Sequence, residues 1–128
     1  SKELINRAIR VRKVLGGGMR QVGYLAACGI YALENNIERL SQDHIKAKEI
    51  ESTLFKLSFI KKVEKVETNI VIFEIQANVD SELFLNILNN KGVKLISMGD
   101  NKLRLVTHLD YTDQMHKSFL KILNDLNF

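Results

Sequence analysis

The sequence of 128 residues has no proline, no tryptophan and one cysteine, Cys28. A single cysteine excludes an internal disulfide, and its place in the most apolar stretch predicts a buried thiol in a reducing compartment. The longest apolar run, residues 22–33, is well short of the roughly 20 residues that span a bilayer, and no signal-peptide pattern is present. These absences argue against a membrane role, and we expect a cytoplasmic protein.

Common catalytic and metal-binding motifs are also absent. His44, His108 and His116 have no partner at ligand spacing, so we expect surface or capping histidines and no metal site. No GxSxG stretch occurs, and Cys28 has small apolar neighbours rather than activating cations. The net charge of +4 comes from 19 basic and 15 acidic residues that are interspersed, and aromatic residues make up 7%. This balance argues weakly for anionic ligands and against nucleic acid.

The sequence does contain a regular series of helix and strand signals. Hydrophobic spacing predicts three helices and then a ββαββα series, an α+β fold with helices on one face of an antiparallel or mixed sheet. The expected helices cover residues 2–15, 19–34, a segment N-capped by Ser41, 80–90 with Asp80 as N-cap, and a last segment capped by Thr112. The expected strands cover residues 60–66, 70–75, 94–98 and 103–109. We expect a boundary after residue 40, with residues 41–128 forming a small C-terminal α+β domain.

Apolar side chains at helical spacing predict which faces are buried. The second helix is apolar almost all the way round, and a helix of that kind is buried against partners on more than one side. In the third and last helices the expected buried stripes are Ile45, Ala47, Ile50, Leu54 and Leu57, and Met115, Phe119, Ile122 and Leu126.

The stretch LGGGMRQ, residues 15–21, separates the first two helices. Each glycine inside a helix costs about 1 kcal/mol relative to alanine, so three in a row predict a break. Free N–H groups at the start of the second helix, with Arg20 beside them, would attract an anion. The alternative is a flexible turn with a surface arginine, and residue type alone leaves both open.

The stretch LRLVTHLD, residues 103–110, alternates as a strand does. One face carries Leu103, Leu105, Thr107 and Leu109, and the other carries Arg104, Val106 and His108. We expect the first face to be the core, so the second presents an arginine on a rigid strand, where a carboxylate clamp would be built. The alternative is that Arg104 pairs with an Asp or Glu on a solvent face, and both interpretations remain open.

Two stretches, RKVLGGGMRQVGYLAACGIYALENNIERLSQDHIKAK and LRLVTHLD, together resemble the C-terminal part of the low-specificity L-threonine aldolases, pyridoxal-phosphate enzymes of the aspartate aminotransferase fold type. The resemblance covers essentially the whole chain and implies the small domain of a fold-type I enzyme. It implies retro-aldol cleavage of L-threonine or L-allo-threonine to glycine and acetaldehyde, with pyridoxal 5'-phosphate as the electron sink. It also implies two partners: a large pyridoxal-phosphate-binding domain of the parent protein, and further copies in a homo-oligomer.

The same resemblance implies roles for three residues. Arg104 matches the arginine that binds the substrate carboxylate. Lys13 and Arg20 match the lysine and arginine of the family's glycine-rich block, which lies near the cofactor or the neighbouring subunit's active site. On this interpretation residues 1–40 are linking helices and a glycine-rich interface loop.

One part of the family pattern is missing from this sequence. The Schiff-base lysine of the family lies in a Ser-x-Ser-Lys-Gly-Leu-Gly stretch, and no such stretch occurs here. We therefore expect no catalytic residue in this chain, a piece of a longer protein, and no activity from the chain alone. The alternative is a stand-alone α+β module that binds a small anion or serves in dimerisation.

Overall fold

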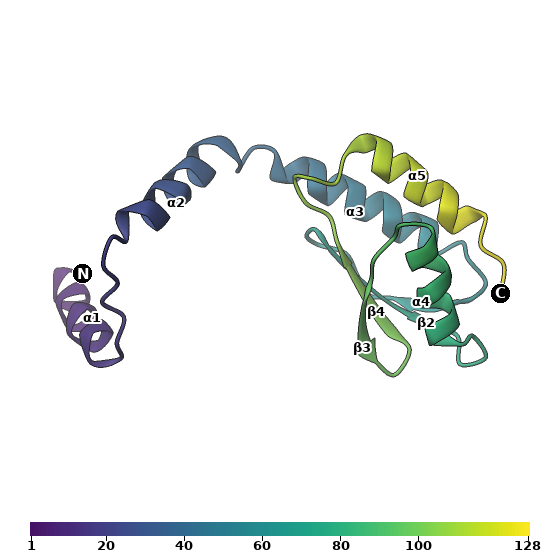
Figure 1. The fold of residues 1–128 in the computed structure, drawn as a ribbon, viewed down its shortest axis with the longest axis horizontal. Coiled ribbons are helices and arrows are strands. Elements are labelled where there is room, and N and C mark those ends of the chain that lie inside the picture. The colour runs from purple at the N-terminus through teal and green to yellow at the C-terminus, as the bar shows by residue number, and fades with distance from the viewer. The chain divides into compact units, whose positions relative to one another are not determined.

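A computed structural model describes all residues from Ser1 to Phe128, and its elements follow the predicted order (Figure 1). The helices are α1 (Lys2–Val14), α2 (Gly23–Asn35), α3 (Leu40–Leu54), α4 (Ser81–Asn90) and α5 (Asp113–Asn124). The strands are β1 (Ile60–Val63), β2 (Ile70–Ile75), β3 (Ile96–Gly99) and β4 (Lys102–Val106). Backbone packing divides the chain into two units, Ser1–Ile37 and Glu38–Phe128. The α+β fold expected from the sequence is confirmed.

The glycines end α1, as the sequence predicts. Gly16 has a φ of +79°, a left-handed conformation that favours glycine. Its N–H donates to the carbonyl of Lys13, and the N–H of Gly17 donates to the carbonyl of Arg12 over 2.8 Å. This pair of bonds is a Schellman motif, which satisfies the last carbonyls of a helix. Two of the three glycine N–H groups are therefore occupied by α1.

The predicted burial of the second helix and of Cys28 is wrong for this chain. No residue of α2 is buried, and the Cys28 thiol is exposed. Burial needs an apolar surface to pack against, and every residue of α1 is exposed as well. The first unit therefore presents apolar side chains that it does not cover itself.

The second unit is a four-stranded sheet with helices on one face. The strand order is β1-β2-β4-β3, and every neighbouring pair is antiparallel. Alternate side chains of β2 and β4 are buried in the core, where they pack with side chains of α3, α4 and α5. The buried side chains of these elements include Ala47, Ile50, Leu54, Val71, Phe73, Ile75, Phe84, Leu88, Leu103, Leu105, Phe119 and Leu123. The opposite face of the sheet has no helix of this unit over it.

Some predicted boundaries and buried stripes are wrong. Ser41 is not the N-cap of α3, because the helix begins at Leu40 and its N-cap is Arg39. The Ser41 hydroxyl donates instead to the carbonyl of Glu38. Ile45 and Met115 are more than half exposed. The buried stripe of α5 starts one residue later than expected, with His116 buried in place of Met115. The expectation that His116 is a surface or capping residue is therefore wrong.

The caps of the last two helices match the sequence. The Asp80 carboxylate accepts from the N–H groups of Glu82 and Leu83, and the Thr112 hydroxyl accepts from the N–H of Met115. Gly92 has a φ of +78° just after α4, where the chain turns toward β3. The bounds of β2 are as predicted, whereas β1 ends at Val63 rather than Val66 and β4 at Val106 rather than Leu109. The third strand covers Ile96–Gly99 rather than residues 94–98.

The replacement Phe84→Ala tests the core. Phe84 is fully buried, and its ring centroid lies 5.9, 6.4 and 5.3 Å from those of Phe59, Phe73 and Phe128. Removing the ring leaves a cavity, so urea unfolding of the 128-residue chain is expected to show a loss of about 3–5 kcal/mol. The neighbouring Leu83→Ala, at an exposed position, is expected to lose less than about 1 kcal/mol. Equal losses would contradict this assignment of the core.

Candidate functional site

The open face of the sheet carries Arg104 among apolar side chains. Ile72 on β2 and Ile96 on β3 lie directly opposite Arg104 in the strand register. Val106 follows two residues along β4, and Val106 and Ile96 are 40% and 52% exposed. Side chains directly opposite each other on one face are in contact distance. A single guanidinium therefore lies in an apolar surface that this unit leaves uncovered.

Arg104 has no acidic partner in the chain. None of the ion pairs includes it, so the interpretation of Arg104 as half of a surface ion pair is not realised. Its Nε is shielded from solvent and has no hydrogen-bond partner. A buried donor without an acceptor costs about 1–3 kcal/mol. A planar carboxylate would remove this penalty, because it accepts two parallel bonds from a guanidinium.

The carboxylates nearest to this face are already held by lysines. Glu74 on β2 accepts from Lys61 at 2.6 Å, and Glu64 accepts from Lys62 at 2.7 Å. The hydrogen bond and charge of Lys62 lower the pKa of Glu64, so this carboxyl stays ionised and paired at neutral pH. The chain therefore neutralises its own acids beside Arg104 and leaves the arginine free.

Lys13 and Arg20 lie in the first unit and form no ion pair or side-chain hydrogen bond within the chain. The Lys13 Nζ lies 3.9 Å from where a Cβ on Gly18 would be. Residues 20–22 form a turn, and α2 starts at Gly23, so the triglycine does not supply the first amides of that helix. The anion site expected at the start of the helix is thus not formed by these glycines, while the roles of Lys13 and Arg20 stay predictions.

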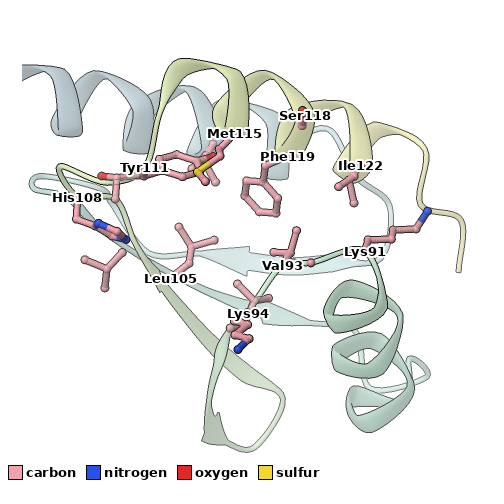
Figure 2. A pocket seen from close by; sticks show the side chains of 15 residues that line it. Lys91, Val93, Lys94, Leu105, His108, Tyr111, Met115, Ser118, Phe119 and Ile122 are labelled. Atoms are coloured by element: carbon pink, nitrogen blue, oxygen red, sulfur yellow. The ribbon is translucent and has the colours of Figure 1, made fainter.

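A groove of about 400 Å³ lies elsewhere in the second unit, between α5, residues 91–95 and the end of β4 (Figure 2). Figure 2 shows Tyr111, Met115, Phe119 and Ile122 along one side of it. Lys91, Lys94, His108 and Tyr111 are its charged or titratable lining residues. The groove does not include Arg104, so this hollow and the unpaired arginine are separate features.

Sequence reasoning missed a set of polar contacts that join α3 to α5. His116 Nε2 lies 2.7 Å from Glu49 Oε2, and His116 Nδ1 lies 3.1 Å from the Tyr111 hydroxyl. Burial raises the pKa of Tyr111. His116 lies three residues before Phe119 and seven before Leu123, a spacing that would have placed it on the buried stripe. These contacts are structural, and no group of three or more His, Cys, Asp or Glu side chains has the geometry of a metal site.

Two further polar side chains are buried near the start of α3. The Thr107 hydroxyl donates to the carbonyl of Asp43 at 2.8 Å, and the Asp43 carboxylate accepts from Arg39 at 2.8 Å. Asp43 is only 2% exposed, and Arg39 is its ion-pair partner. The end of β4 is therefore fastened to α3 by hydrogen bonds just beyond Arg104.

Comparison with solved structures identifies the class of fold. The lyase C-DES, in a structure with glycine covalently linked to its pyridoxal-phosphate cofactor, matches 82% of this chain and 28% of its own with a TM-score of 0.61. The sequence identity is 16%, so this likeness shows the fold alone. The fold is that of the small domain of fold-type I pyridoxal-phosphate enzymes, as the sequence predicts.

Sequence comparison then gives the family. A family model described as beta-eliminating lyase matches residues 1–78, and the chain belongs to that family. Low-specificity L-threonine aldolase 1 of Arabidopsis thaliana is 36% identical over 115 residues, covering 88% of this chain and 32% of the relative. Low specificity L-threonine aldolase of Escherichia coli K12 is 38% identical over 110 residues, covering 86% and 32%. The chain thus spans about a third of the length of these relatives. None of its helices is long and apolar enough to cross a bilayer.

The free energy of unfolding tests whether Arg104 contributes to the stability of the fold. Arg104→Met removes a shielded donor that has no acceptor, so the free energy of unfolding should stay unchanged or rise by up to about 1 kcal/mol. Arg39→Met removes the partner of a buried carboxylate and should lower it by about 2 kcal/mol. Urea denaturation of the two variants makes the comparison. A loss at Arg104 as large as that at Arg39 would mean that Arg104 holds the fold together.

Proposed function

We propose that this chain is the C-terminal part of a pyridoxal-phosphate-dependent aldolase that cleaves L-threonine or L-allo-threonine to glycine and acetaldehyde. Two low-specificity L-threonine aldolases match 88% and 86% of the chain, and the chain belongs to the beta-eliminating lyases. The observation that carries the proposal is Arg104, a guanidinium with a shielded, unpartnered Nε on an open sheet face.

Arg104 binds the carboxylate of the amino-acid substrate. The two forms of threonine and the glycine product share this group, so one arginine serves the substrate and the product. Ile72 and Ile96 are directly opposite Arg104 on the two neighbouring strands, and apolar surroundings strengthen a charge-assisted bidentate pair. β4 is hydrogen-bonded to β2 on one side and to β3 on the other, so Arg104 extends from a rigid strand. A rigidly held arginine orients the bound amino acid.

Pyridoxal phosphate, when bound, supplies the electron sink that carbon–carbon cleavage beside an amino group needs. Lys13 and Arg20 fit its phosphate or an anion at the neighbouring subunit's site, because both are exposed cations without an ion pair in this chain. The Schiff-base lysine is not among the residues of this chain that match the family pattern. The rest of the parent protein supplies it, together with the large cofactor-binding domain.

Assembly with that domain and with further copies accounts for the exposed apolar residues of α2. Tyr24, Leu25, Ile30 and Leu33 are each more than half exposed. Contiguous apolar surface of this kind marks an interaction site in soluble proteins. We propose that the first unit links the two domains and contributes to a homo-oligomer interface.

Kinetics of the full-length protein test the role of Arg104. Arg104→Gln removes the bidentate charge and should lower kcat/KM for L-threonine about 10- to 100-fold, mostly through KM. Arg104→Lys keeps the positive charge but cannot form the bidentate pair, so its kcat/KM should lie between those of the parent protein and Arg104→Gln. Lys102→Met, two residues earlier on the same strand, is the matched control and should change kcat/KM less than about threefold. An unchanged KM in Arg104→Gln would contradict the proposal.

The isolated 128-residue chain separates the proposal from its main alternative. With added pyridoxal phosphate it should release no glycine from L-threonine, because it lacks the Schiff-base lysine of the family. Calorimetric titration with glycine, threonine and pyridoxal phosphate should show no saturable binding, because one arginine is only part of a site. Saturable binding would favour a stand-alone anion-binding module, and robust glycine release would contradict the assignment of the catalytic lysine to another part of the protein.

A further inference from the structure

Arg104 has a potential internal competitor in Glu74. Ile72 is directly opposite Arg104, and Glu74 lies two residues further along β2 on the same face. Side chains in this diagonal relation are about 7–8 Å apart at their bases, within reach of one another when both are long. Glu74 is opposite Lys102, yet the ion pair it forms is with Lys61 on the other side. The direction in which Glu74 turns therefore decides whether Arg104 is free.

A β-bulge provides the lysine that holds Glu74. Ile60 pairs with Ile75 and Lys62 pairs with Glu74, so Lys61 is an extra residue in β1. As a result two lysines, Lys61 and Lys62, lie beside the two acids of this part of the sheet. The Lys61 Nζ lies 2.6 Å from Glu74 Oε1, and the Lys62 Nζ lies 2.7 Å from Glu64 Oε1. Lys62 and Lys102 are directly opposite Glu74 in the strand register, but the ion pair that Glu74 forms is with the bulge residue Lys61.

We propose that Lys61 is a positioning residue for substrate binding: by holding Glu74 on the β1 side, it keeps this carboxylate away from the guanidinium of Arg104. The inference rests on the proposed function, because it concerns the same carboxylate site. Lys61 does not contact the substrate and acts through Glu74 alone. Without Lys61, Glu74 competes with the amino-acid carboxylate for Arg104 and weakens binding in the ground state and the transition state equally.

The test uses the full-length protein loaded with pyridoxal phosphate, with L-threonine kinetics and calorimetric titration of glycine. Lys61→Met keeps the length of the side chain and removes its charge. An exposed ion pair is weak, so KM for L-threonine and Kd for glycine should both rise about three- to fivefold, while kcat stays constant. Salt screens the competing pair and should reduce the difference from the parent protein.

Two further variants make the result specific. In Lys61→Met with Glu74→Gln the competitor has lost its charge, so KM and Kd should return to the parent values. Lys65→Met removes a lysine paired with Glu67, away from Arg104, and matches the change in net charge. It should leave KM and Kd unchanged.

Three results would contradict the role of Lys61, and one other result would contradict the proposed function. Unchanged KM and Kd in Lys61→Met, no rescue by Glu74→Gln, or an equal defect in Lys65→Met would each contradict the role of Lys61. These results can occur while Arg104→Gln still raises KM, in which case the proposed function stands. An Arg104→Gln variant with normal KM and Kd would instead remove the proposed function itself.

Discussion

The structure depends on the two-residue alternation of side chains along β4. Leu103 and Leu105 are buried under the helices, and this requires Arg104 to point to the opposite face. A slip of one residue would bury a guanidinium in the core and expose two leucines, at a cost of many kcal/mol. The hydrophobic core therefore specifies where the arginine lies, although the arginine contributes nothing to that core.

Much of this arrangement was predictable from the sequence because the relevant signals are local. The period of two in LRLVTHLD gave the face of Arg104, and Asp80 and Thr112 gave two helix starts. The break at the glycines was predictable for the same reason, since left-handed φ and helix propensity are properties of single residues. In each case the physical cause lies within a few residues of the element that it determines.

What could not be predicted depends on partners distant in the chain. The partners of His116 are one example: its Nε2 lies against Glu49, 67 residues away, and its Nδ1 against the Tyr111 hydroxyl. The lack of a partner for Arg104 is also a tertiary property, since it requires knowing that Glu74 on β2 and Glu64, just after β1, are paired with lysines. The exposure of α2 is a third example. Its apolar composition predicts burial, but composition does not say whether the surface that buries it belongs to the same chain.

These features have a common physical basis in the conflict between stability and binding. A fold selected for stability alone would pair the shielded Nε of Arg104 with an acid, and Glu74 is on the right face to do so. The sheet instead carries a bulge whose extra residue, Lys61, forms the ion pair with that acid. The energetic penalty of an unsatisfied donor is thereby retained in this chain, and under the proposed function a bound substrate carboxylate would remove it. Strain of this kind is concentrated at binding sites, because the interactions that a ligand will make have to be left unmade before it arrives.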